Sequence, residues 1–119
     1  MQTRYDLPRD EIMAPGHQGC SGCGVALAMR LVLKALGPNT VFVFPAGCCT
    51  LIDGPWPHSA SGVPVVHTPA ASGPAAASGI RAALDYSGDT GTTVCCWTGA
   101  GGSFDSGFQA LSASAARNE

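Results

Sequence analysis

Residues 20–48 read CSGCGVALAMRLVLKALGPNTVFVFPAGC, and this stretch decides the fold. Its segment 24–36 is rich in Ala, Leu and Met, which are strong helix formers. Gly37, which a proline follows directly, supplies the stop signal at the end of the expected helix. Arg30 and Lys34 share one face of that helix because their spacing is close to one turn, so the rest of its surface is apolar.

Apolar strands alternating with helices are predicted for the rest of the chain. Residues 41–44 form a continuous apolar run, which is typical of a strand buried on both faces. Further along, we expect a strand at 63–67, a helix at 70–86, a strand at 92–97 and a last helix, capped by Ser103 or Asp105, through Ala116. This order favours an α/β fold with an open parallel sheet flanked by helices, in which ligands bind beyond the carboxyl ends of the strands.

The composition excludes several classes of function. The chain has 119 residues, the size of one domain, and only 12% of them are charged, which indicates a chain covered on several sides. A formal net charge of −2 gives no reason to expect nucleic acid or a membrane surface as a partner. No apolar stretch approaches the ~20 residues of a membrane span, and the N-terminus does not have the pattern of a secretory signal. We therefore expect a cytoplasmic protein.

Six cysteines in a chain without an export signal favour metal or redox chemistry over disulfides. Cys20 and Cys23 form a CxxC motif at the start of the expected helix, where two thiolates can point at one metal or cluster. Cys48 follows the first expected strand and can supply a third ligand. From the spacing alone, a thioredoxin-like dithiol, half of a zinc site and a pair of buried thiols remain alternatives. The remaining cysteines are expected to point away from this site or to be buried as small apolar residues: Cys49, Cys95 and Cys96.

A glycine-rich segment and one histidine are the other candidates for ligand binding. Residues 98–103, TGAGGS, follow the third expected strand, and backbone amides in such a turn can cradle a phosphate. A tight connection between a strand and a helix is the alternative explanation. His67 ends the second expected strand, where a ligand crevice opens, and a structural hydrogen-bonding role is its alternative. Trp56 and Trp97 are expected to be packing residues.

Five segments resemble the beta subunit of pyruvate:ferredoxin oxidoreductase (pyruvate synthase) and its 2-oxoacid relatives. They are HQGCSGCG at 17–24, LVLKALG at 31–37, PAGC at 45–48, GIRAAL at 79–84 and the stretch 97–113. The cysteine spacing with its flanking glycines carries most of the likeness, which extends over nearly the whole chain.

The resemblance implies a thiamine-diphosphate-binding α/β fold with one [4Fe–4S] cluster near the cofactor. By this likeness Cys20, Cys23 and Cys48 are cluster ligands, and the fourth family cysteine lies downstream of this chain. The implied cofactor-binding residues are Gly47, Cys48, His67, Gly99, Gly101, Gly102 and Ser103. The implied reaction is oxidative decarboxylation of pyruvate or a related 2-oxoacid with coenzyme A, which yields acyl-CoA, carbon dioxide and reduced ferredoxin. The implied partners are subunits of the alpha, gamma and delta type, ferredoxin, the 2-oxoacid and coenzyme A.

Two departures from the family pattern stand out. Thiamine enzymes carry a GDG motif whose Asp binds the Mg²⁺ on the diphosphate, but this chain has Gly99-Ala100-Gly101, and a methyl group cannot coordinate a cation that demands oxygen ligands. The chain also ends at Glu119, so we expect an arm at 1–19 and a domain at 20–119 that is truncated at its C-terminus. The alternative is a small non-catalytic zinc- or cluster-binding module.

Overall fold

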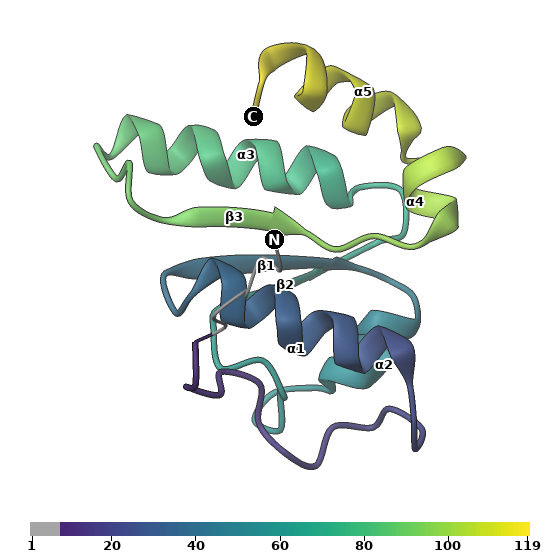
Figure 1. Ribbon diagram of the computed structural model, residues 1–119. Helices are drawn as coiled ribbons and strands as arrows, with labels where there is room; N and C mark the ends of the chain where they lie inside the picture. The colour runs from purple at the N-terminus through teal and green to yellow at the C-terminus, as the bar shows by residue number, and fades with distance from the viewer. Residues whose placement is uncertain (1–7) are drawn as a thin grey trace, which may run out of the picture.

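A small parallel sheet forms the centre of the molecule (Figure 1). The computed structural model describes residues 8–119, so the first part of the expected arm 1–19 lies outside the described residues. Within them the sheet has three strands in the order β2-β1-β3, and both pairings are parallel. The strands are β1 Thr40–Pro45, β2 Val65–Thr68 and β3 Thr93–Cys96.

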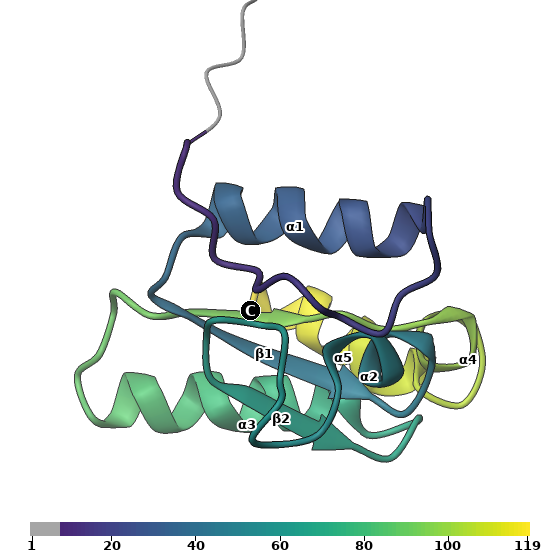
Figure 2. The ribbon, with the colours of Figure 1, turned by 90° about the horizontal axis from the view of Figure 1, so that it is seen from below.

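Helices cover both faces of this sheet. Within residues 8–119 they are α1 Gly24–Leu36, α2 Cys48–Asp53, α3 Gly73–Tyr86, α4 Ala100–Phe104 and α5 Phe108–Arg117. Figure 2 shows α1 on one face of the sheet and α3 on the opposite face, and α5 packs on α3 (Figure 1). The expected α/β fold with an open parallel sheet is confirmed. None of the helices formed by residues 8–119 is both long and apolar enough to cross a bilayer.

The core forms where α1 meets the central strand. Phe42 and Phe44 of β1 are fully buried, and their rings stack with centroids 5.1 Å apart. Met29 and Leu33 of α1 are also fully buried, at the i, i+4 spacing that places both on one helix face. Burial of each of these large side chains stabilises the fold by about 1.5–3 kcal/mol. Val43, whose side chain points to the opposite face of β1, is also fully buried, so the prediction that the first strand is buried on both faces is confirmed.

Residues 11–14 of the N-terminal arm contact α1 and the loop that precedes β2, and we call this segment the strap. Glu11 forms ion pairs with Arg30, at 2.5 Å, and with Lys34, at 2.6 Å, which confirms that these two basic residues share a helix face. Backbone hydrogen bonds from Ala14 N–H to the Ala60 carbonyl and from Gly62 N–H to the Ile12 carbonyl complete the strap.

Two predictions about local structure are wrong. The expected last helix is divided into α4 and α5, because Asp105 leaves the helical conformation at φ −125° and ψ −118°. Ser103 lies inside α4 and Asp105 ends it, so neither residue caps a helix at its start.

Trp56 is 89% exposed and packs little, so its expected packing role is wrong. Trp97 packs edge-on against Phe42, with ring centroids 6.4 Å apart, as expected of a packing residue.

Substitution Glu11→Gln should lower the stability of the strap in a pH-dependent way. Hydrogen bonds from Arg30 and Lys34 lower the pKa of Glu11 from 4.5 to about 2. Because the folded-state pKa is the depressed one, the stabilisation is present above pH 4.5 and is lost as the pH falls toward 2. Urea unfolding should give a lower midpoint for the variant at pH 7 and converging midpoints near pH 2. Asp10→Asn, at an exposed neighbour, is the matched control, and an equal effect of both substitutions would contradict this assignment.

Candidate functional site at the carboxyl ends of the strands

The segments that carry the candidate ligand-binding residues meet at one edge of the sheet. All three described strands are parallel, so their carboxyl ends point the same way and the segments that follow them converge. β1 leads through Gly47 into α2, and β3 leads through Gly99 into α4. Figure 1 shows α2 and α4 at the same end of the sheet. His67 lies at this edge too, one residue before the end of β2.

The CxxC motif forms a tight turn that opens α1. Cys23 N–H donates to the Cys20 carbonyl at 3.0 Å, and Gly22 between them adopts a positive φ of 74°, a conformation that favours glycine. Cys23 is the N-cap of α1. A hydrogen bond from Gln18 N–H to the Ile52 carbonyl, at 3.3 Å, ties the segment that precedes this turn to α2.

Cys48 is the first residue of α2, so the predicted ligands come from the starts of two neighbouring helices. Cys20 and Cys48 are exposed and Cys23 is half-buried. Within residues 8–119, however, no three Cys, His, Asp or Glu side chains are gathered closely enough to hold a metal ion. The structure therefore places the three cysteines on adjacent elements without bringing their sulfur atoms around one point.

Of the other cysteines, Cys49 is buried, whereas Cys95 and Cys96 are half-buried, as Cys23 is. Burial raises the pKa of the Cys49 thiol, the neighbouring Cys48 and Cys23 side chains add to the shift, and a hydrogen bond with Trp97 opposes it. Burial also raises the pKa of Cys95, and that of Cys96 to about 11. Burial therefore disfavours the thiolate form of these three cysteines, which is the form that binds a metal. Cys49 itself, which was expected to point elsewhere than Cys48, belongs to the buried core.

The glycine-rich segment forms the start of α4 rather than an open loop. Gly99 is the N-cap of α4, and Ser103 N–H already donates to the Gly99 carbonyl at 3.0 Å. A side chain added at Gly99 or Gly101 would meet open space. A Cβ added at Gly102 would lie 2.1 Å from Thr98 Oγ1 and 2.9 Å from the Ala70 carbonyl oxygen. The backbone at Gly102 is therefore packed tightly, whereas that of its neighbours is accessible.

A buried carboxylate contacts His67. Asp53, the last residue of α2, is 1% exposed and accepts hydrogen bonds from Ser59 Oγ and from the Ser61 N–H, both at 2.9 Å. His67 Nε2 lies 3.5 Å from Asp53 Oδ2, and the ring stacks on Phe44 with centroids 6.1 Å apart. Sequence reasoning missed Asp53, although a single acid at the end of the apolar run 48–52 was a visible signal.

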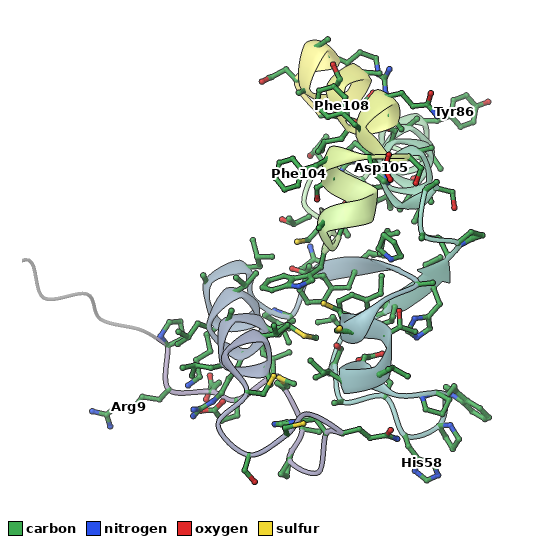
Figure 3. All side chains as sticks on the ribbon, turned by 90° about the vertical axis from the view of Figure 1, so that its right-hand side faces the viewer. Arg9, His58, Tyr86, Phe104, Asp105 and Phe108 are labelled. Atoms are coloured by element: carbon green, nitrogen blue, oxygen red, sulfur yellow. The ribbon has the colours of Figure 1, made fainter. Side chains whose placement is uncertain are left out.

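An open cavity of about 790 Å³ lies between the arm and α1. Its lining includes Glu11, His17, Cys20, Cys23 and Arg30. The CxxC turn therefore forms part of the wall of a surface hollow that a prosthetic group or a neighbouring segment can enter. His58, the histidine of the loop before β2, points outward and away from this hollow (Figure 3).

Curated relatives with known names match most of this chain. It is 44% identical to ketoisovalerate oxidoreductase subunit VorB of Pyrococcus abyssi over 117 residues, which cover 94% of this chain and 38% of the relative. It is 43% identical to pyruvate synthase subunit PorB of Methanothermobacter thermautotrophicus over 106 residues, 89% of this chain and 37% of the relative. The chain is homologous to the beta subunits of 2-oxoacid:ferredoxin oxidoreductases.

The resemblance seen in the sequence is confirmed by these relatives. The VorB subunit of Pyrococcus horikoshii is similar to the same degree, with 45% identity over 117 residues. The chain spans about 38% of the length of these VorB subunits. No protein-family model matches the chain. Because relatives named for ketoisovalerate and for pyruvate are about equally similar, the homology does not select one 2-oxoacid.

Substitution Gly102→Ala should destabilise the turn that follows β3. The added methyl group overlaps Thr98 Oγ1, and overpacking of this kind costs about 1–3 kcal/mol of unfolding free energy. Gly101→Ala is the matched control, since its Cβ meets open space and alanine favours the helix. Urea denaturation followed by circular dichroism measures both. Equal stabilities of the two variants would contradict the close packing at Gly102.

Proposed function

We propose that the chain is the thiamine-diphosphate- and [4Fe–4S]-binding part of a 2-oxoacid:ferredoxin oxidoreductase. The reaction is oxidative decarboxylation of pyruvate or a related 2-oxoacid with coenzyme A to acyl-CoA and carbon dioxide, with reduction of ferredoxin. The observation that carries the proposal is the position of Cys20, Cys23 and Cys48 at the starts of two neighbouring helices. The names of the homologous subunits support the choice of reaction.

The cysteine set has the chemistry that an iron–sulfur cluster needs. Thiolates are the usual cluster ligands, and of the three proposed ones Cys20 and Cys48 are exposed and Cys23 is half-buried. Assembly requires the side chains of Cys20 and Cys48 to turn toward Cys23, which their exposure permits. The fourth iron ligand comes from outside this set.

We propose that the cofactor binds beside this cysteine set, at the carboxyl ends of the strands, and we call this edge of the sheet the cofactor edge. Backbone groups of Gly47, Gly99, Gly101 and Gly102, the side chain of Ser103 and the ring of His67 are the proposed contacts. Thiamine diphosphate supplies a carbanion and an electron sink when it is bound. The proposed role of the start of α4, where Gly99 and Gly101 are exposed, is to bind and orient the diphosphate through backbone N–H groups.

The residues present do not fit the magnesium ion of that cofactor. Ala100 is the first residue of α4 and offers a methyl group where the family places a carboxylate. A cation of this kind is held by oxygen ligands in near-octahedral geometry. No step is therefore assigned to Mg²⁺, and weak cofactor binding by this chain is expected.

Other subunits, ferredoxin, the 2-oxoacid and coenzyme A are the proposed partners, in the cytoplasm. Apolar side chains exposed on α2, α4 and α5 support a subunit that other chains cover: Leu51, Phe104 and Phe108. Figure 3 shows Phe104 and Phe108 at the surface of α4 and α5. Nucleic acid and membrane are not proposed as partners, because the net charge of −2 gives neither an attraction.

A non-catalytic zinc- or cluster-binding module is the second candidate. Ala100 favours it, since a chain that cannot hold Mg²⁺ at this position is poorly equipped for thiamine chemistry. A zinc ion would use Cys20 and Cys23 with ligands from elsewhere and would give no visible colour.

Anaerobic reconstitution with iron and sulfide should yield a brown protein with roughly four iron atoms per chain. Cys20→Ser, Cys23→Ser and Cys48→Ser should each lower the bound iron severalfold, because a hydroxyl is a poor ligand for iron in a cluster. Iron and acid-labile sulfide analysis measures the content. Cys95→Ala is the matched control, since this thiol packs against the core, and it should leave the content unchanged.

Two outcomes would count against the three-cysteine site. The first is an iron content of Cys48→Ser equal to that of the unsubstituted protein. The second is stoichiometric zinc without colour, bound through Cys20 and Cys23, which favours the zinc module.

Substitution Ala100→Asp should strengthen Mg²⁺-dependent binding of thiamine diphosphate by at least about tenfold, or about 1.4 kcal/mol. The added carboxylate supplies the oxygen ligand that the methyl group lacks. Isothermal titration calorimetry with Mg²⁺, and again with EDTA, separates the metal-dependent part. Ala100→Asn, similar in size but uncharged, should gain less. No gain for Ala100→Asp would show that this segment is not the diphosphate site.

A further inference from the structure

The buried C-terminal end of α2, where Asp53 lies, is an unusual position for a carboxylate. Asp53 is the last residue of α2, where the helix dipole disfavours negative charge, and its side chain is fully buried. A buried charge is tolerated only when neighbouring groups compensate it. Ser59 Oγ lies 2.9 Å from Oδ1 and 3.0 Å from Oδ2, and the Ser61 N–H donates to Oδ1.

These donors leave one side of the carboxylate for His67. Oδ1 receives the Ser61 N–H and shares the Ser59 hydroxyl with Oδ2, so Oδ2 keeps capacity to accept. His67 Nε2 lies 3.5 Å from this oxygen. Phe44 stacks on one face of the imidazole ring, so both Phe44 and Asp53 contact His67.

The sign of the charge decides which ring nitrogen carries the proton. An unprotonated Nε2 would direct a lone pair at a carboxylate, which is repulsive, whereas an Nε2–H is attracted to it. The partner of one ring nitrogen thereby fixes the state of the other. Within residues 8–119 no hydrogen bond engages Nδ1, and the His67 side chain is 38% exposed at the carboxyl end of β2.

We propose that Asp53 is a positioning residue that holds the proton of neutral His67 on Nε2 and leaves Nδ1 as the acceptor open to a ligand. The group that neutral His67 contacts is then an N–H or O–H donor of the ligand rather than a bare phosphate oxygen. This rests on the proposed function only in assigning His67 to the cofactor edge.

The same short helix links two parts of the site. α2 begins at Cys48 and ends at Asp53, a length of about 9 Å at 1.5 Å per residue. Movement of Cys48 toward a cluster therefore acts on a helix whose far end is bonded to the loop before β2 and contacts His67. Asp53 anchors that far end.

The test is the tautomer of His67, measured by long-range nitrogen–proton NMR on the protein labelled with ¹⁵N-histidine, without cofactor, at a pH where imidazole is neutral. His67→Gln assigns the signal among the three histidines. The unsubstituted protein should show a protonated Nε2 and an unprotonated Nδ1. An Nδ1–H tautomer there overturns the proposal, and this measurement needs no variant that must fold.

Asp53→Asn provides the matched change. The Ser61 N–H keeps its acceptor if the amide oxygen takes the place of Oδ1, and the amide NH₂ then faces Nε2 and donates to it. The populated tautomer should therefore switch from Nε2–H to Nδ1–H, whereas a merely structural role for Asp53 predicts the same tautomer in both proteins. Asp105→Asn, at an exposed aspartate beyond β3, is the control and should leave the tautomer unchanged.

A cofactor titration separates this proposal from the proposed function. Thiamine diphosphate added to the same NMR sample should shift the Nδ1 signal of His67 if the ring lies at the cofactor edge. An Nδ1 signal that does not move under saturating cofactor refutes that assignment of His67 but leaves the tautomer result standing. An unchanged tautomer in Asp53→Asn refutes the positioning role whether or not the cofactor binds.

Discussion

The burial of β1 is the constraint on which the rest of the structure depends. Phe42 and Phe44 on one face and Val43 on the other are fully buried, which suits the central position of β1 in the sheet. β2 and β3 then pair with it on either side, in parallel. Because all strands run the same way, the segments that follow them are forced to one edge. The position of the candidate site thus follows from the central, buried position of β1 and the parallel pairing of its neighbours.

Burial affects the cysteines unequally. It raises the pKa of the Cys49 and Cys95 thiols, whereas Cys20 and Cys48, near the starts of α1 and α2, are exposed. The short helix α2 runs from the exposed Cys48 to the buried carboxylate of Asp53, so packing and site geometry are coupled.

Local sequence signals predicted the regular elements, and tertiary contacts decided the rest. The segment 24–36 became α1 with the bounds expected, because its composition, its apolar face and Gly37 all agree. The break at Asp105 was not predictable, since it depends on Gly107 packing against the backbone of Gly102. The proposed role of Asp53 depends on how the loop that follows α2 folds back to place Ser59 and Ser61 on the carboxylate, which no periodicity reports. Homology supports the family, whereas the cysteine set and the convergence of its sulfur atoms remain predictions.

The most direct measurement is the anomalous scattering of iron in crystals of the anaerobically reconstituted protein. The account predicts one iron peak at the start of α1 and α2, bounded by the sulfur atoms of Cys20, Cys23 and Cys48. An iron peak that only the CxxC pair contacts, with Cys48 turned to solvent, would contradict it.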